Sequence, residues 1–329
     1  MLALAGEACC LVVPSPLHRE GDYMLADRMR MLKGSPIVVY VGAYDGKVRK
    51  LSSLDGSTIW TSSDFGSEAR GLATDPDGNV YVGAYDGKVR KLNPSNGSTI
   101  WTSESYGNYT WGIATDSDGN VYVGAYDGKV RKLNPSNGST IWTSESYGNY
   151  AIGLATDPDG YVYAGAHDGN ARKLNPSNGS TIWTTPADFG SYIYGVAVGP
   201  DENVYIGSYG GRVRKLYPSN GNVYWTSSDF GSNTHGVAID PDGYVYIGAD
   251  DGKVRKLNPS DGSTIWTSDS FGAEAYGLAT DSDGYVYVGT DVGEVKKLDP
   301  SDGSTIWTSD DFGEDAHGLV TNYCTGWGL

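Results

Sequence analysis

The sequence is poor in cysteine, in phenylalanine and methionine, and in basic residues. Its three cysteines, Cys9, Cys10 and Cys324, lie outside a repeated region, so the fold does not depend on a disulfide framework. Five Phe and four Met stand against 25 Tyr, nine Trp and 47 Gly. Glycine supplies the positive φ of tight turns and aromatic side chains suit pleated sheets, so this composition indicates an all-β chain.

The shortage of positive charge excludes two classes of partner. With 24 Lys and Arg against 40 Asp and Glu, the net charge is -16. Nucleic acid and acidic membrane surfaces both require clustered cations, so neither is expected, and a neutral or basic partner is favoured.

Long hydrophobic runs are also missing, and no stretch is predicted to span a membrane. The mildly apolar start, residues 1–17, contains Glu7 and no basic segment, so a signal peptide is not the favoured interpretation. The compartment stays open, with an extracellular, cell-surface or virion setting favoured over a cytoplasmic one.

What the sequence does contain is one unit repeated seven times. The frame VYVGAYDGKVRKL recurs in steps of 41 or 42 residues, starting at Val39, Val80, Val121, Val162, Val204, Val245 and Val286. Within 112–144, the segments GIAT, VYVGAY, KVRKL and STIWTS are separated by glycine-containing turns and read as four short strands. This period predicts a seven-bladed β-propeller of four-stranded antiparallel blades, with a linear β-solenoid as the alternative.

The two ends of the repeated region are expected to share one blade. The first copy begins at its second strand, near Ile37, and the missing first strand follows the last copy as Gly318–Thr321. The C-terminal strand should therefore close the first blade, which gives a propeller domain at 37–329. Residues 1–36 are expected to be a leader, either disordered or with a short helix at Asp22–Gly34.

Seven tryptophans each follow a turn glycine by four residues, at Trp60, Trp101, Trp142, Trp183, Trp225, Trp266 and Trp307. Over residues 37–321 this spacing resembles the PQQ-like (pyrroloquinoline-quinone-type) propeller repeats, and the resemblance implies that these tryptophans are structural and dock neighbouring blades. The alanine of that docking motif is replaced by Lys50, Lys91, Lys132, Lys173, Lys215, Lys256 and Lys297. We expect each lysine to lie across an indole ring, with a cation–π gain of about 0.5 to 2 kcal/mol.

Differences among the copies gather on one face of the predicted ring, the upper face, which carries the links between blades and the hairpins between second and third strands. The residues preceding the inner-strand glycine are Arg70, Trp111, Ile152, Tyr194, His235, Tyr276 and His317. The hairpin residues are Tyr44, Tyr85, Tyr126, His167, Tyr209, Asp250 and Asp291. These side chains favour a non-catalytic rim that binds a glycan or a peptide or protein ligand, for surface or virion attachment or as an assembly scaffold. The alternative is drift of surface loops, although drift would favour small polar residues.

Cofactors are not expected. The Asp-x-Asp-Gly turns resemble calcium loops but lack the carboxylate spacing of an EF-hand, and turn formation explains them without metal. The adjacent Cys9 and Cys10 resemble the cysteine pair of quinone-dependent alcohol dehydrogenases, but those rings are larger, so no quinone is expected.

One enzymatic alternative remains open. The segment GIATDSDGNVYVG also resembles the repeat of the streptogramin lyases, which implies a metal-assisted lyase or hydrolase with a rim histidine. His235 or His317 would then act as general base beside Glu274 or Asp315.

Overall fold

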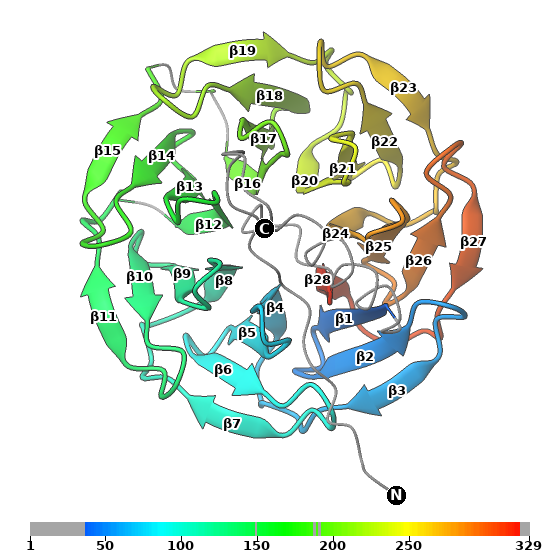
Figure 1. Cartoon of the computed structure of the whole chain (residues 1–329). Helices are drawn as coiled ribbons and strands as arrows, with labels where there is room; N and C mark the ends of the chain where they lie inside the picture. Colours follow the sequence, from blue (N-terminus) through cyan, green and yellow to red (C-terminus); the bar gives the residue numbers. More distant parts are fainter. Residues whose placement is uncertain (1–36, 149, 187–188, 190–191, 323–329) are drawn as a thin grey trace, which may run out of the picture.

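The structure, a computed structural model, describes residues 37–148, 150–186, 189 and 192–322. These residues form 28 strands, grouped as seven four-stranded antiparallel sheets around one axis (Figure 1). The predicted seven-bladed β-propeller is therefore confirmed. The predicted leader and its Asp22–Gly34 helix, together with all three cysteines, lie outside the described residues. Within the described part of the chain, no helix is long and apolar enough to cross a membrane.

Each blade has an inner, a second, a third and an outer strand. The inner strands are β4 (Ala69–Thr74), β8 (Thr110–Thr115), β12 (Ala151–Thr156), β16 (Ile193–Val198), β20 (Thr234–Ile239), β24 (Ala275–Thr280) and β28 (Ala316–Thr321). The second strands are β1 (Val38–Ala43), β5 (Val80–Ala84), β9 (Val121–Ala125), β13 (Val162–Ala166), β17 (Val204–Ser208), β21 (Val245–Ala249) and β25 (Val286–Thr290).

The remaining strands complete the blades towards the circumference. The third strands are β2 (Val48–Ser52), β6 (Val89–Leu92), β10 (Val130–Leu133), β14 (Ala171–Leu174), β18 (Arg212–Leu216), β22 (Val254–Leu257) and β26 (Val295–Leu298). The outer strands are β3 (Thr58–Thr61), β7 (Thr99–Thr102), β11 (Thr140–Thr143), β15 (Thr181–Thr184), β19 (Val223–Thr226), β23 (Thr264–Thr267) and β27 (Thr305–Thr308). We number the blades by their second strands, so blade 1 contains β1 and blade 7 contains β25.

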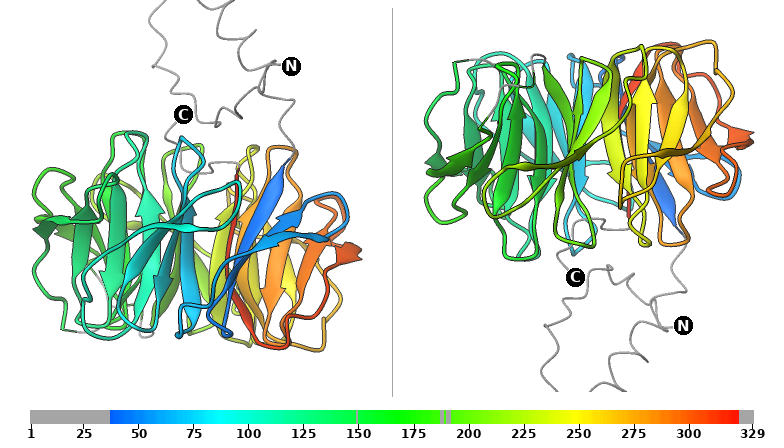
Figure 2. Two further views of the ribbon diagram at one scale, coloured as in Figure 1. Left: turned by 90° about the horizontal axis from the view of Figure 1, so that it is seen from below. Right: turned by 90° about the horizontal axis from the view of Figure 1, so that it is seen from above.

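Blade 1 is completed by the C-terminal strand, as predicted. Strand β28 pairs with β1 in antiparallel register, with Val41 opposite Leu319. The sheet order is β28-β1-β2-β3, whereas the other six blades use four consecutive strands. The side views of Figure 2 show the resulting disc, with strands running between its two faces. Closure leaves every inner strand with a neighbouring blade on both sides.

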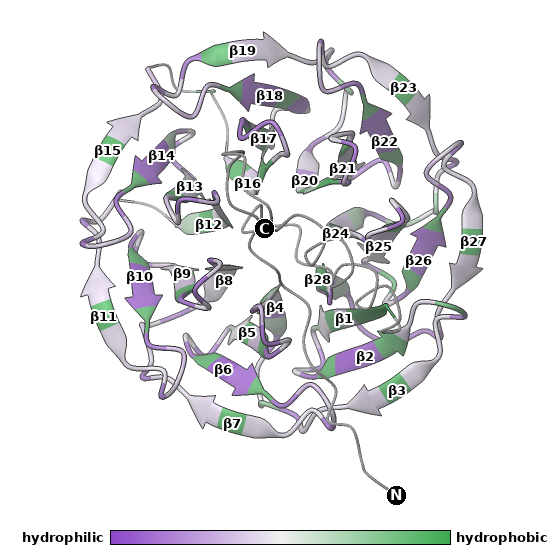
Figure 3. Cartoon of the chain, in the orientation of Figure 1, coloured by the Kyte–Doolittle hydropathy of each residue, from purple (hydrophilic) through white to green (hydrophobic). Residues whose placement is uncertain are grey.

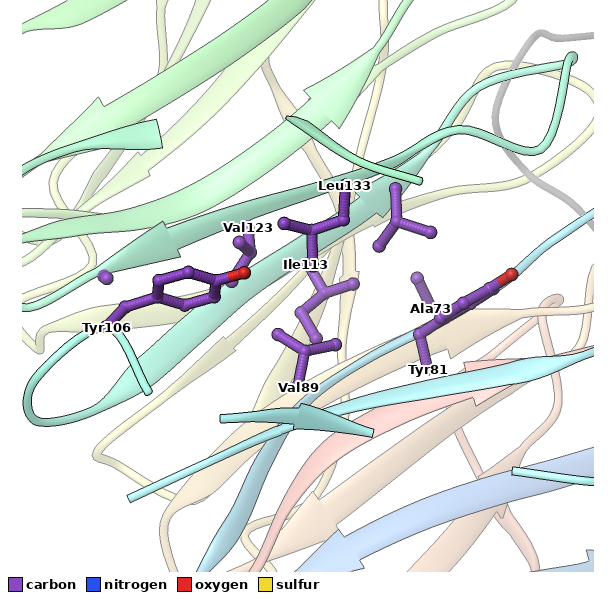
Figure 4. Packing of buried hydrophobic residues seen from close by; sticks show 9 residues of the cluster. Ala73, Tyr81, Val89, Tyr106, Ile113, Val123 and Leu133 are labelled. Atoms are coloured by element: carbon purple, nitrogen blue, oxygen red, sulfur yellow. The ribbon is translucent and has the colours of Figure 1, made fainter. Parts of the chain in front are cut away.

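Apolar side chains fill the seven spaces between adjacent blades. Between blades 2 and 3, Tyr81 and Val89 pack with Ile113, Val123 and Leu133 (Figure 4). The other six junctions carry equivalent clusters. The hydrophobic effect thus acts between blades, so each blade depends on its neighbours for its core.

The third strands are hydrophilic in Figure 3, although most of their side chains are buried or half-buried. In blade 2, Arg90 forms an ion pair with Asp86 at 2.6 Å and its guanidinium lies 4.7 Å from the Phe65 ring centroid. Pairing and stacking of this kind offset the cost of removing the charge from water.

The tryptophans of the outer strands contact the following blade. Trp60 Nε1 donates a hydrogen bond to the Pro94 carbonyl at 3.0 Å, and its ring packs so closely on Gly97 that a Cβ there would meet it at 2.6 Å. At the closing junction, Trp307 makes the equivalent contacts to Ser53 and Gly56.

The expected cation–π contact between each repeat lysine and an indole ring is wrong, because the ammonium lies over a tyrosine ring. Lys50 pairs with Trp60 across strands β2 and β3, but its ammonium lies over the Tyr40 ring, 5.5 Å from the centroid. Its Nζ also donates to the Pro94 carbonyl at 2.9 Å. This hydrogen bond draws the ammonium towards the next blade, so the cation–π partner is tyrosine rather than tryptophan. The same arrangement recurs at the other six lysines.

The inner strands line a narrow axial channel with a cavity of about 190 Å³. At its lower end, five threonine hydroxyls connect successive inner strands, as when Thr115 Oγ1 donates to the Thr74 carbonyl at 2.7 Å. The equivalent bonds come from Thr74, Thr156, Thr280 and Thr321. Val198 and Ile239 occupy the same position in blades 5 and 6 and interrupt the ring of hydroxyls.

Candidate functional site

A β-bulge places each rim residue at the upper mouth of the channel. In blade 3, Thr110 pairs with Ala125 and Gly112 with Gly124, so Trp111 between them has no partner on the second strand. The same register shift occurs in the other six inner strands. Bulges commonly redirect a side chain, and here a bulge recurs at the rim position, whose residue differs between copies. The rim residues therefore lie inside the inner strands, which begin two residues earlier than the sequence indicates.

Three scaffold positions meet at each junction of the mouth, and we call such a group a niche. A niche consists of the rim residue and the hairpin residue of one blade, and the residue two positions before the rim residue of the next blade. In order from blade 1, the niches hold His317, Tyr44 and Glu68; Arg70, Tyr85 and Tyr109; Trp111, Tyr126 and Tyr150; Ile152, His167 and Tyr192; Tyr194, Tyr209 and Asn233; His235, Asp250 and Glu274; and Tyr276, Asp291 and Asp315.

The niches share their rings in one continuous belt around the mouth. The members of this aromatic belt are Tyr44, Tyr85, Tyr109, Trp111, Tyr126, Tyr150, His167, Tyr192, Tyr194, Tyr209, His235, Tyr276 and His317. Neighbouring rings lie between 3.9 Å and 6.4 Å apart by centroid, close enough to interact as aromatic pairs. The belt runs from Tyr85 through His167 and His235 to Tyr44.

Arg70 joins the two ends of this belt. Its guanidinium lies 4.6 Å from the ring centroids of both Tyr44 and Tyr85, and 5.4 Å from that of Trp111. It also bonds the Glu68 carboxylate at 3.1 Å and contacts the Tyr44 hydroxyl. The guanidinium is therefore held by one acid and three rings.

Exposure differs along the belt. Tyr126, Tyr192 and Tyr209 are 41%, 44% and 38% exposed, so part of each residue is open to a ligand. Most other members are half-buried. The predicted rim residue Ile152 is only 8% exposed and packs in the wall of the mouth.

Two histidines of the belt are neutral at physiological pH. Burial lowers the pKa of His167 to about 4. Burial, with smaller effects from the charges of Arg70 and His235, lowers the pKa of His317 to about 2. His317 Nε2 lies 3.5 Å from the Asp315 carboxylate without forming a hydrogen bond, so burial outweighs this neighbour.

His235 has a different environment, because carboxylates surround it. Its Nε2 hydrogen-bonds Asp250, whose other oxygen accepts from the Asn233 amide at 2.6 Å. Ligand atoms of His235, Asp250 and Glu274 all lie within 4.8 Å of one another. Tyr276 donates its hydroxyl to Glu274 at 2.6 Å. Of the two enzymatic arrangements considered from the sequence, His235 beside Glu274 gathers three ionisable groups and His317 beside Asp315 two.

Sequence reasoning missed Tyr109, Tyr150 and Tyr192, although all three belong to the belt. Each lies two residues before a rim residue, in the stretches NYTW, NYAI and SYIY. The available signal was an aromatic residue at the same offset in three successive copies, together with acids at that offset in the first copy and the last two.

A quinone does not fit the mouth. Pyrroloquinoline quinone carries several carboxylates and would require cations. Arg70 is the single Arg or Lys among the niche residues, all of which the structure describes, and Glu68 already pairs with it.

The Asp-x-Asp-Gly turns, which resemble calcium loops, use their first carboxylate within the turn. Asp116 accepts hydrogen bonds from the Asn120 backbone N–H and from the Tyr122 hydroxyl, the latter at 2.8 Å.

Comparison with known proteins gives one family and one fold. The family model described as outer membrane protein assembly factor BamB, of PQQ-like repeats, matches residues 44–193, 168–270 and 250–322. Among solved structures, the computationally designed Ika8 protein is similar, with 21% identity over 85% of this chain and 86% of that chain, and a TM-score of 0.68. At that identity the likeness shows the fold alone. No curated protein sequence matches the chain.

Proposed function

Because this chain belongs to the PQQ-like repeat family of the outer membrane protein assembly factor BamB, we propose that it is a binding module that recognises a protein or peptide segment at its upper mouth. A propeller of these repeats fits a binding or scaffold role. The observation that carries the finer proposal is the aromatic belt, which gathers three exposed tyrosines and a run of half-buried rings around the upper end of the ring.

The charges beside the belt favour a basic or neutral segment. Asp250, Glu274, Asp291 and Asp315 lie along blades 6, 7 and 1, and Glu68 follows them. Burial and the nearby Asp291 raise the pKa of Asp315, because its charged form is poorly solvated and repelled. A lysine or arginine side chain placed there would relieve this repulsion, while the tyrosines would pack against its neighbours.

The matching family supports the same choice of partner. That family is named after an assembly factor for outer membrane proteins. A glycan is the second ligand class, favoured by the three exposed tyrosines, which offer the flat faces on which sugar rings stack.

Peptide and glycan arrays test the proposal, followed by titration of the selected ligand with two variants of blade 5. Tyr209 belongs to the belt, whereas Tyr224 is 50% exposed on outer strand β19 and serves as the matched control. We expect Tyr209→Ala to weaken binding at least tenfold and Tyr224→Ala to leave it within twofold. Equal losses in both variants, or no ligand from either array, would contradict the proposal.

The contact of His235 with Asp250 beside Glu274 favours one rival function, a metal-assisted lyase or hydrolase of the streptogramin-lyase type. A histidine in that setting could act as general base. Turnover of an ester or lactone substrate that disappears in His235→Ala, while Tyr209→Ala leaves it unchanged, would favour the enzyme over the binding module.

A further inference from the structure

The blade 6 niche differs chemically from the other six. Its three scaffold positions hold His235, Asp250 and Glu274, all of which can bind a metal ion. The blade 7 niche has two carboxylates but Tyr276 in place of the histidine, and the niches of blades 2 to 4 hold mainly aromatic rings. Within the part of the chain that the structure describes, this is also the one group of three His, Cys, Asp or Glu residues close enough to share an ion.

From this convergence we propose that the blade 6 niche binds a zinc-class divalent ion, through His235 Nε2 and one carboxylate oxygen each of Asp250 and Glu274. This inference goes beyond the proposed recognition function and does not depend on it. The three ligand atoms lie within 4.8 Å of one another, and ligands held tetrahedrally by one zinc at about 2.0 to 2.2 Å lie about 3.3 to 3.6 Å apart. Small side-chain movements are therefore enough to form the site.

The chemistry of the three ligand atoms indicates which metal ion the niche prefers. An imidazole nitrogen with two carboxylates suits zinc and similar transition ions, whereas calcium and magnesium prefer six or more oxygen ligands, including water. The two carboxylate charges balance a divalent ion. Three protein ligands leave the fourth tetrahedral position open towards the mouth, where a donor atom of a bound ligand could complete it.

Neighbouring side chains already orient the two carboxylates. The Asn233 amide donates to one oxygen of Asp250, and the Tyr276 hydroxyl donates to Oε2 of Glu274. Such outer contacts fix ligand geometry and raise affinity in known metal sites. His235 and Asp250 belong to blade 6 and Glu274 precedes the inner strand of blade 7, so the ion would also connect two adjacent blades.

Zinc titration by calorimetry, and cobalt absorption spectra, test the site on the full chain after treatment with a chelator. We expect His235→Ala to remove one bound zinc per chain and the nearly isosteric Asp250→Asn to weaken that zinc at least tenfold. Asp291→Asn is the matched control, because Asp291 occupies the same hairpin position in blade 7, where the niche has no histidine. Asp291 Oδ1 accepts a hydrogen bond from the Glu274 backbone N–H at 2.8 Å, and an asparagine oxygen can keep that bond, so this variant should change affinity less than twofold. Thermal unfolding of each variant checks that the propeller is intact.

Several outcomes would overturn the proposal. It is wrong if the chain binds no zinc, or if all bound zinc persists in His235→Ala, since that zinc would belong to other donors such as the Cys9 and Cys10 thiols. It is equally wrong if Asp291→Asn weakens binding as much as Asp250→Asn does.

Discussion

At the scale of single residues, glycine determines how closely the inner strands can approach the neighbouring blade. A Cβ on Gly318 would lie 1.8 Å from the Arg70 carbonyl oxygen, which is impossible without moving the strand. Gly313, in the link just before, has a φ of 78° but open space around it. Gly318 is therefore required because a side chain has no space there, whereas Gly313 is favoured because its backbone adopts a positive φ.

We expect Gly318→Ala to destabilise the chain by about 3 kcal/mol or more, and the control Gly313→Ala by about 1 kcal/mol, which is the cost of positive φ alone. Urea denaturation measures both. If the two substitutions cost the same, close strand approach does not explain the inner glycines.

His317 gives the protein a pH dependence that can be measured. Its pKa is about 2 in the folded chain and near 6.5 when unfolded, so the unfolded chain binds more protons in between. Its contribution to stability is fully present above about pH 6.5 and is lost progressively as pH falls towards 2.

When the pH falls from 7 to 5, protonation of His317 in the unfolded chain should lower the free energy of unfolding by about 2 kcal/mol. His317→Gln should reduce this pH dependence by about the same amount. Denaturant titrations of both proteins at the two pH values measure the difference. Parallel pH profiles would show that the imidazole is not buried as described.

The position of a residue in the repeat does not determine which side chains surround it. The segments 80–109 and 121–150 are identical, yet their final tyrosines have different neighbours: Tyr109 stacks parallel to Trp111, whereas Tyr150 meets Trp111 edge-on and contacts His167. Comparison of the seven copies locates the varying positions but cannot show which constant residues they contact, because those contacts cross between blades.

At the scale of strands, the threonine hydroxyls connect inner strands that share no sheet. Thr156 Oγ1 donates to the Thr115 carbonyl at 2.8 Å, while Val198 at the same position of blade 5 provides no donor to the Thr156 carbonyl. Val198→Thr should add the missing bond and stabilise the chain by about 0.5 to 1 kcal/mol, and the reverse change, Thr156→Val, should cost about 1 kcal/mol. Denaturation midpoints at constant m-value test this. A destabilising Val198→Thr would mean that the hydroxyl finds no acceptor.

Strand order and blade count followed from the period, because glycine and turn residues recur at fixed offsets. The bulge before each inner glycine did not. A bulge depends on how two strands pair across the blade, and residues such as Trp111 carry no local signal for being left unpaired. This is why the rim residues were expected in the links rather than within the inner strands.

At the scale of the whole molecule, the residues repeated at all seven junctions provide stability, and the residues that differ between blades provide specificity. The inter-blade clusters and the tryptophan contacts recur at every junction, closure included, so they set the scaffold. The niches sit on that scaffold at equivalent points and differ in side chain, from aromatic in blades 2 to 4 to acidic in blades 6 and 7. A binding surface can change in such a protein without altering its core.

Oxidative labelling of surface tyrosines, with and without the ligand selected on the arrays, tests most directly whether recognition occurs at the upper mouth. The aromatic belt predicts that bound ligand protects Tyr126, Tyr192 and Tyr209, while Tyr217 and Tyr224 on the outer part of blade 5 stay equally reactive. Protection of Tyr217 and Tyr224 with the belt tyrosines left reactive would contradict this account.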